Sequence, residues 1–501
     1  MVGTAHLLLI LGLGLAGWSA PMHAATYYVD SAHGADNRPG SSQSAAWKTL
    51  GKVNATDFRP GDRILLASGS LWHEQLAPRS SGSEGKPIVL DRYGEGAMPS
   101  ISGDGTSPDT VLLRNVQQIE LHHLEITNHG ATPSPRRGLH IFLDNFGTAR
   151  HIVIADLYIH DVNGTNQKKD NGGIVFRTNG DKVPSRFDGL TIERNVVWKV
   201  DRSGIVAESY HASRLHWFPS LHVVIRDNYV EDIGGDGIVP WATNGALVEH
   251  NIARKCNQRS TDYNAGIWQW STDNTLLRLN EASETRGTHD GEGFDSDYNS
   301  RNTRFEYNYG HDNEGGFMLI CTPVKREPQS NLGNSSTVVR FNISRNDHTR
   351  LINLSGADDV KVEDNAFYVG PGHDVQMLVS DWLGWSRNAI FRDNTFYVHE
   401  GTLRFGHSIA RNPDGTYVLA PGWGPAINIS YTGNKYVGAV TDPPEDFKNG
   451  SAAVPPSNSP QINWSGPSFD PSRPQDYPAF IMAHRSWMIS LFKQQFGHAP
   501  D

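Results

Sequence analysis

The sequence predicts an all-β fold, a parallel β-helix in which the strands of each coil stack on the equivalent strands of the next. Two observations predict it. A short stretch of alternating apolar residues that ends in asparagine recurs along the chain, and glycine-led apolar segments alternate with it. The 50 glycines and 28 prolines among 501 residues show no collagen-like period, so they favour a turn-rich β protein over a helical one.

The chain begins with a segment that is typical of export. It contains an apolar run from Leu7 to Ala16, and we expect a secretory signal over residues 1–24, with cleavage near Ala24 or Ala25. The run is too short to span a bilayer, and no later stretch is apolar enough to do so. We therefore expect a secreted or periplasmic protein without a membrane partner.

The asparagine repeat organises residues 25–440, the predicted β-helix domain. Its copies end at Asn195, Asn228, Asn251, Asn280, Asn308, Asn342, Asn365 and Asn394, with gaps of 23 to 34 residues. Such a period is typical of a solenoid, and the alternation within each copy predicts strands. We expect each asparagine at one fixed turn, where its amide forms a ladder along the axis and its backbone is left-handed. A propeller or sandwich would show recurrent Asn-Gly hairpins, which these repeats lack.

The glycine-led segments predict a second strand in each coil. They begin at Gly173, Gly204, Gly237, Gly266, Gly293 and Gly316. The residue after each glycine is Ile or Phe and should point inward, so the residues one and three positions further on should point outward. The first predicted outward column is Val175, Val206, Val239, Trp268, Asp295 and Met318. The second is Arg177, Glu208, Trp241, Trp270, Asp297 and Ile320.

The acidic stretch DGEGFDSDYN, residues 290–299, falls on one of these strands. Asp295 and Asp297 would lie on its outer face about 6.5 to 7 Å apart, near the separation that an inverting glycosidase needs. Like charges at that distance push their pKa values apart, so one carboxyl can stay protonated while the other is ionised. Glu292, at the corner before the strand, is a third catalytic candidate and aligns with Asp236 two coils earlier.

The neighbouring coils predict a sugar-binding face. The side chains expected to contact a substrate are Trp268, Trp270, Trp241, Glu208, Arg177 and Asp236. The tryptophans would expose flat apolar faces on which sugar rings stack.

Other interpretations of the acidic residues stay open. Glu314 in the next coil could supply the catalytic acid instead. Asp295, Asp297 and Glu292 could also hold a calcium ion, or they could be plain surface under a loop. Three His-Asp pairs, His160–Asp161, His289–Asp290 and His311–Asp312, recur at turns, which indicates capping of turns rather than catalysis.

The first coils resemble a known family. The stretches TYYVDSAHGADNRPGSSQSAAWKTLGKV, FRPGDRILLASGSLWHEQL and GKPIVLDRYGEGAMPSISGDG are similar to the entry coils of the right-handed parallel β-helix, pectate-lyase-like superfamily of secreted carbohydrate-active enzymes. The resemblance extends from about Thr26 to about Asn434. It implies a single-stranded right-handed solenoid with an N-terminal cap, and action on a glycan by hydrolysis, elimination or epimerisation. No lyase motif maps onto the chain, and the epimerase-type DPHD signature is absent.

We therefore expect a polysaccharide-degrading enzyme, a glycoside hydrolase that uses paired carboxylates on a polysaccharide or oligosaccharide. One alternative is a polysaccharide lyase that acts by β-elimination on a uronate-containing glycan, with Lys325 and Arg326 nearby and calcium as a candidate helper. Another is a non-catalytic glycan-binding solenoid. No cofactor and no bound metal are required by the hydrolase interpretation.

Composition limits the partners. A net charge of -10 without a basic stripe argues against a nucleic-acid partner, and we expect a monomer. Cys256 and Cys321 are the only cysteines, and the sequence leaves open whether they pair or stay as buried thiols.

The repeat gives way to a tail over residues 441–501. Its first part is rich in proline and serine, which predicts an extended segment along the solenoid. Its last part, DYPAFIMAHRSWMISLFKQQF, has apolar residues at helical spacing. We expect a short helix that caps the terminal coil, with its apolar stripe as core.

Overall fold

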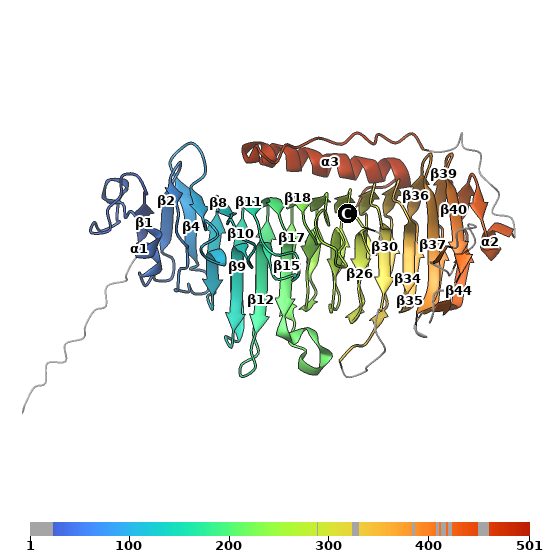
Figure 1. Cartoon of the computed structure of the whole chain (residues 1–501), viewed down its shortest axis with the longest axis horizontal. Coiled ribbons are helices and arrows are strands. Elements are labelled where there is room, and N and C mark those ends of the chain that lie inside the picture. Colours follow the sequence, from blue (N-terminus) through green and yellow to red (C-terminus); the bar gives the residue numbers. More distant parts are fainter. Residues whose placement is uncertain are drawn as a thin grey trace, which may run out of the picture.

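The computed structural model describes residues 24–287, 289–322, 330–382, 386–406, 410–411, 417–418, 423–448 and 460–500. In this part of the chain three long parallel sheets run along the molecule, here called sheets 1, 2 and 3 (Figure 1). Successive strands pass from sheet 1 to sheet 2 and sheet 3 and then return to sheet 1 one coil further on. This arrangement confirms the predicted parallel β-helix.

The sheets have similar lengths. Sheet 1 begins at β1 (Thr26–Val29) and ends at β44 (Ile427–Thr432). Sheet 2 comprises β3 (Leu71–Trp72), β5 (Ser100–Ser102), β8 (Glu125–Asn128), β11 (Tyr158–Val162), β14 (Val196–Val200), β18 (Tyr229–Ile233), β22 (Ile252–Arg254), β25 (Glu281–Ser283), β29 (Tyr309–His311), β33 (Ile343–Arg345), β36 (Ala366–Val369), β39 (Thr395–Val398) and β45 (Lys435–Val437). Sheet 3 comprises β6 (Asp109–Arg114), β9 (Arg137–Asp144), β12 (Gly172–Asn179), β15 (Ser203–Ser209), β19 (Ile238–Val239), β23 (Ile267–Gln269), β26 (Glu292–Ser296), β30 (Gly316–Cys321), β34 (Arg350–Ser355), β37 (Asp374–Trp382), β40 (Thr402–Gly406) and β46 (Val440–Thr441). The short β43 (Trp423–Pro425) joins it by antiparallel pairing with β37.

The predicted asparagine ladder is present at the corner between sheets 1 and 2. The ladder asparagines are buried, and from Asn228 onward each accepts hydrogen bonds from the asparagine one coil earlier. Asn195, the first of them, accepts from the Leu157 N–H. The backbone N–H and the Nδ2 of Asn251, for example, donate to Asn280 Oδ1 at 3.0 and 3.1 Å. The ladder ends where Asn434 donates to Asp446 of the short helix α2 (Glu445–Lys448). The amide column therefore joins all these coils by hydrogen bonds within the core.

The sequence predicted a left-handed backbone at the asparagine of this corner, but the structure has it at the residue before the asparagine. Its φ lies between 53° and 55° at Arg194, Asp227, His250, Leu279, Tyr307, Phe341, Asp364 and Asp393. The asparagine must aim both its N–H and its amide at the next coil, so the preceding residue makes the turn. Even Leu279 and Phe341 take this conformation, which costs roughly 1 kcal/mol for a residue with a Cβ.

The predicted register of sheet 3 holds from β12 to β26. Ile205 pairs with Ile238, Ile238 with Ile267, and Ile267 with Phe294, so this column fills the interior. Asp295 stands beside Trp268 on the outer face. The alternation therefore placed the acidic strand correctly.

The register prediction is wrong by one residue in β30. Phe294 pairs with Met318, and Asp295 pairs with Leu319. Met318 and Ile320 accordingly point into the core, whereas Leu319 and Cys321 face outward and line a pocket. Residues 317–321 are all apolar or weakly polar, so their alternation could not reveal which face is outside.

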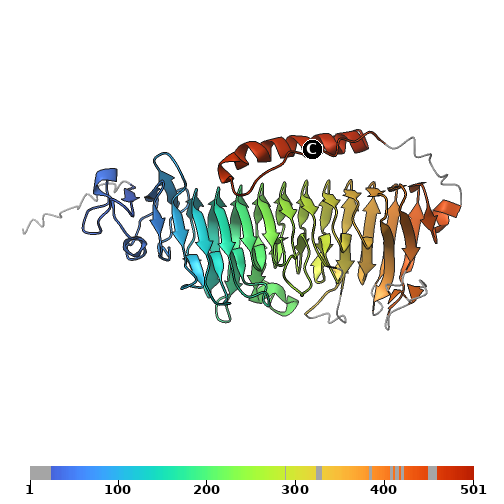
Figure 2. The ribbon, with the colours of Figure 1, turned by 45° about the horizontal axis from the view of Figure 1, so that its top comes forward.

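Helices cover one end and one flank of the solenoid. At the N-terminal end, α1 (Leu50–Asn54) buries Leu50 and Val53 in the solenoid core, as expected for a cap (Figure 1). Residues 460–476 run back along sheet 2, and the 20-residue α3 (Tyr477–Phe496) lies along the same flank (Figures 1 and 2). The apolar stripe of α3 is core, as predicted. The helix covers a flank, however, and does not cap the terminal coil.

None of the helices in the described ranges is long and apolar enough to cross a membrane. The expected export signal lies outside the described residues. Cys256 and Cys321 are both buried free thiols, which decides between the two alternatives left open by the sequence.

Candidate active site

A pocket of about 580 Å³ opens on the outer face of sheet 3. Strands β23, β26, β30 and β34 contribute residues to its floor, and the adjoining loops, with the loop before β12, contribute the rest of its lining. Its lining residues are Lys169, Asp262, Tyr263, Asn264, Ala265, Trp268, His289, Asp290, Asp295, Asp297, Tyr298, Leu319, Cys321, Arg350, Asn353 and Ser355. The pocket thus collects most of the charge of the acidic stretch.

One wall is built around Trp268. The sequence predicted an exposed indole face, but Trp268 is only 5% exposed, because its Nε1 donates to Asp236 at 2.9 Å and Lys169 Nζ lies 4.8 Å from its ring centre. Asp236 is fully buried and also pairs with Lys169 at 2.9 Å and with Arg202 at 3.0 Å. The structure therefore makes Asp236 a support of the wall, with no surface for a substrate. Trp268 keeps part of its surface in the pocket.

Asp295 lies at the pocket floor and is only 3% exposed. Its Oδ1 is buried and has no hydrogen-bond partner among the described residues. Burial, and next the neighbouring charge of Asp297, raise the pKa of Asp295 well above its usual range. This carboxyl is therefore held in its neutral form.

Asp297 is half-buried at the edge of the same floor. Its Oδ1 accepts hydrogen bonds from the Tyr298 N–H at 2.7 Å and from the Cys321 thiol at 3.2 Å. Burial raises the pKa of Asp297 to about 7, against the lowering effect of these two donors. Asp297 can therefore gain or lose a proton near neutral pH.

Asp290 is the site residue that the sequence argument missed. The recurrence of His-Asp pairs predicts a turn cap for Asp290 and His289, but both side chains line the pocket. Asp290 is half-buried, and burial raises its pKa to about 6, against the opposing effect of Arg350. It precedes β26, so strand alternation says nothing of where it points. The density of carboxylates in residues 290–297 was the signal that could have included it.

Glu292 is engaged elsewhere. It is fully buried at the start of β26, where Arg350 Nη2 lies 3.1 Å from its Oε1. Burial raises the pKa of Glu292 to about 8, against the lowering effect of Arg350. Because Glu292 does not line the pocket, the structure favours it as a support for Arg350 over a catalytic role.

The other predicted site residues lie outside this pocket. Glu314 is exposed, and its Oε2 accepts the Gly287 N–H at 2.8 Å. Arg177 and Glu208 pair with each other at 3.1 Å on β12 and β15, several coils away.

The remaining two tryptophans are half-buried beside the pocket. The Trp241 and Trp270 rings lie 4.1 Å apart, and Trp270 also contacts Tyr298, a lining residue, at 5.3 Å. Their mutual packing leaves neither ring as the open platform that the sequence predicted.

Two of the three His-Asp pairs are structural. His160 contacts Asp161 at 2.7 Å and Glu125 of the previous coil at 3.0 Å. His311 makes the equivalent contacts with Asp312 and Glu281. These contacts join side chains to one another, whereas the sequence predicted capping of the turn backbone.

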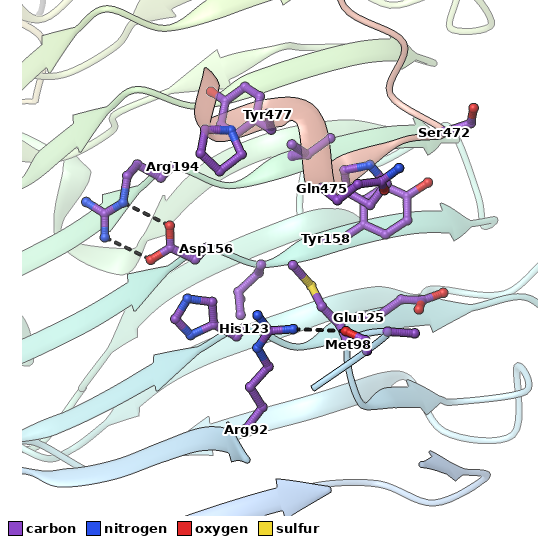
Figure 3. A pocket seen from close by; sticks show the side chains of 16 residues that line it. Arg92, Met98, His123, Glu125, Asp156, Tyr158, Arg194, Ser472, Gln475 and Tyr477 are labelled. Atoms are coloured by element: carbon purple, nitrogen blue, oxygen red, sulfur yellow. Dashed lines mark hydrogen bonds and ion pairs between the residues drawn. The ribbon is translucent and has the colours of Figure 1, made fainter. Parts of the chain in front are cut away.

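A second cavity, of about 540 Å³, lies on sheet 2 beside the first turn of α3 (Figure 3). Its carboxylates are already paired: Asp156 binds Arg194 at 2.8 Å, and Glu125 binds His160. It therefore lacks a group of closely spaced carboxyls with raised pKa values. The chemistry of a hydrolase fits the sheet 3 pocket better.

The comparison with family models agrees with the stacked parallel sheets. Residues 172–331 match the model described as a right handed beta helix region. The chain is a right-handed parallel β-helix protein. The matched range includes β23, β26 and β30, three of the four strands under the pocket.

Two relatives of this β-helix protein are lacto-N-biosidases. The one from Bifidobacterium longum is 29% identical, with 74% of this chain and 29% of the relative covered. The crystal structure of the GH136 lacto-N-biosidase from Eubacterium ramulus matches with a TM-score of 0.63 and 27% identity, covering 81% of this chain and 68% of that one. The β-helix protein thus spans less than a third of the length of the Bifidobacterium relative.

Proposed function

We propose that the β-helix protein is a glycoside hydrolase whose catalytic carboxyls lie in the sheet 3 pocket. The observation that carries this proposal is the group of three lining carboxyls, Asp290, Asp295 and Asp297, all with raised pKa values. Glycoside hydrolysis needs one protonated and one ionised carboxyl on either side of the scissile bond. A set of carboxyls that titrates around neutral pH can supply both forms.

Exposure separates the roles of the three. Asp290 and Asp297 are half-buried and reach the pocket space, whereas Asp295 lies beneath them with little exposed surface. Asp290 and Asp297 are therefore the proposed catalytic pair. One donates a proton to the glycosidic oxygen, and the other attacks the anomeric carbon or activates a water. Asp295, held neutral, limits the negative charge between them.

The substrate proposal rests on the relatives. Because both are lacto-N-biosidases, oligosaccharides that contain lacto-N-biose are the first substrates to test. Tyr263 is 62% exposed and lines the pocket near His289, so its ring is available to stack on a sugar. A wider panel of oligosaccharides and polysaccharides, with mass analysis of the products, covers other linkages.

The test compares three variants on whichever glycan the chain cleaves. Asp290→Asn and Asp297→Asn should each lower kcat by about 10²- to 10⁴-fold, because each removes a proton-transfer group or nucleophile. Asp295→Asn should cost less, because an amide replaces a carboxyl that is already neutral. Full activity in either Asp290→Asn or Asp297→Asn would contradict the proposed pair.

A lyase remains the second candidate, but the cations of the pocket favour a hydrolase. Lys169 is bonded to Asp236 at 2.9 Å, and Arg350 lies 3.1 Å from Glu292, so both cations already contact acidic side chains. Lys325 and Arg326 lie outside the described residues. A lyase product absorbs ultraviolet light through its new double bond, so absorbance that increases with cleavage would contradict hydrolysis.

Calcium also has a direct test. No group of three His, Cys, Asp or Glu side chains in the described ranges is arranged to hold a metal ion, and Glu292 is committed to Arg350. We expect activity to survive EDTA, and a loss that calcium restores would contradict this. We also propose that the chain is exported and monomeric. Fractionation of the producing cells tests export, and gel filtration with light scattering tests the monomeric state.

A further inference from the structure

The thiol of Cys321 touches the carboxyl of Asp297. Cys321 is the last residue of β30, and its Sγ lies 3.2 Å from Asp297 Oδ1. The thiol is 7% exposed and lines the pocket. This contact exists because the register of β30 differs by one residue from the predicted one, which turns Cys321 outward in place of Ile320.

The direction of the hydrogen bond follows from the charges. Burial, and next Asp297 and Asp295, raise the pKa of the Cys321 thiol well above its usual range. The thiol therefore keeps its proton and donates a hydrogen bond to the carboxylate. The Tyr298 N–H donates to the same oxygen at 2.7 Å. Within the described part of the chain both donors go to Oδ1, which leaves Oδ2 for a substrate.

We infer that Cys321 is a positioning residue, whose S–H fixes the orientation of Asp297 and favours its ionised form. The inference rests on the proposed function of Asp297. The other charged groups that act on this pair are Asp290, Asp295 and Lys169 of the same pocket. Neither thiol is needed for a disulfide, because both cysteines are free.

The first test needs no glycosidase activity. A thiolate next to a carboxylate is disfavoured, so Asp297→Asn should lower the pKa of the Cys321 thiol. Its reaction with methyl methanethiosulfonate at mildly alkaline pH should then become faster, by about threefold for each unit by which the pKa falls. Asp262→Asn is the matched control, because the Asp262 carboxylate pairs with Arg202 at 3.1 Å, and it should leave the rate unchanged. An equal rate in Asp297→Asn and in the wild-type chain would overturn the inference.

The Cys256 thiol, which could also react, is removed by substitution. Cys256 is fully buried in the core, and Cys256→Ala gives a chain with Cys321 as its only thiol. If that variant fails to fold, peptide mapping of the modified wild-type chain reports the rate at Cys321 alone. The measurement thus stands whether or not a substrate has been found.

The second test uses the pH profile of kcat/KM. Cys321→Ser keeps a hydrogen-bond donor at this position, and the hydroxyl is a stronger donor than the thiol. The limb of the pH profile that reports the ionisation of Asp297 should therefore move to lower pH. Cys321→Ala removes the donor, so the same limb should move to higher pH by up to about 1 unit. Identical limbs in the wild-type chain and both variants, with unchanged melting temperatures, would overturn the inference. If the wild-type chain cleaves no glycan, the proposed function fails and the thiol reaction alone decides this inference.

Discussion

At the residue scale, the buried amide of Asn280 holds neighbouring coils together. Its Oδ1 accepts two hydrogen bonds from Asn251, and its Nδ2 donates to Val248 O at 2.9 Å. Asn280→Ala leaves the amide of Asn251 buried without this partner. We expect a loss of about 3–5 kcal/mol in the free energy of unfolding, measured by urea denaturation, because unsatisfied buried polar groups are costly.

Asn244→Ala is the control for this prediction. Asn244 is half-buried and accepts a single side-chain bond, from the exposed Asn274, at 2.8 Å. Water can replace that bond, so the loss should stay below about 1 kcal/mol. Equal losses in the two variants would show that burial of the ladder does not matter.

Single residues also mark the limit of the sequence argument about the site. Period-2 alternation placed Asp295 and Asp297 on the outer face, because both lie on one strand with a clear inward neighbour. It could not place Asp290, which precedes the strand, or Cys321, whose strand has no polar alternation. The residues that pair with carboxylates such as Glu292 and hold them away from the pocket come from other coils, so the sequence pattern of one strand does not reveal them.

At the scale of elements, α3 is a helical strap on sheet 2. Leu491 is fully buried in a cluster with Tyr309 and Ile343 of the sheet. Leu491→Asp would place a charge in this apolar contact, at a cost of about 3–5 kcal/mol. We expect faster amide hydrogen exchange in residues 477–496, measured by mass spectrometry. Glycan cleavage should persist, because the pocket lies on sheet 3.

Met482→Asp tests whether any charge on α3 has this effect. Met482 is 65% exposed on the same helix, so its replacement should change stability by no more than about 0.5 kcal/mol. If both variants loosen α3 equally, packing against sheet 2 is not what holds the helix.

The same helix shows what element-level patterns can predict. The spacing of apolar residues predicted a helix with a buried stripe, and the stripe is buried. It did not predict where the helix docks, because the proline-rich segment, expected to extend along the solenoid, has no pattern that fixes the direction in which it runs. In the structure residues 460–476 run back along the solenoid, so α3 covers a flank rather than the end (Figure 2).

At the scale of the whole molecule, the pH dependence of stability follows from groups whose pKa differs between folded and unfolded chains. Burial raises the pKa of Asp297 to about 7 and of Glu292 to about 8, and carboxylate partners, outweighing burial, raise that of His311 to about 9. All three bind more protons in the folded chain, so their stabilising effect is lost as pH rises. Buried His250, with a pKa lowered to about 3, acts oppositely below about pH 6.5.

Asp297 and Glu292 lose their stabilising effect between about pH 4 and 8, and His311 loses its effect between about pH 6.5 and 9. The melting temperature should therefore be highest in mildly acidic solution and should fall from there up to about pH 9. Asp297→Asn removes one of the groups that cause this pH dependence, and asparagine has nearly the same shape as aspartate. At about pH 8 it should stabilise the chain by about 1–3 kcal/mol, and at about pH 4, where the aspartate is protonated in the fold, the gain should be small. Thermal denaturation across this range measures both, with the exposed Glu95→Gln as a control that should change nothing. A gain that is equal at both pH values would mean that Asp297 is not protonated on folding. The carboxyls proposed for catalysis would then impose no cost on the fold near neutral pH.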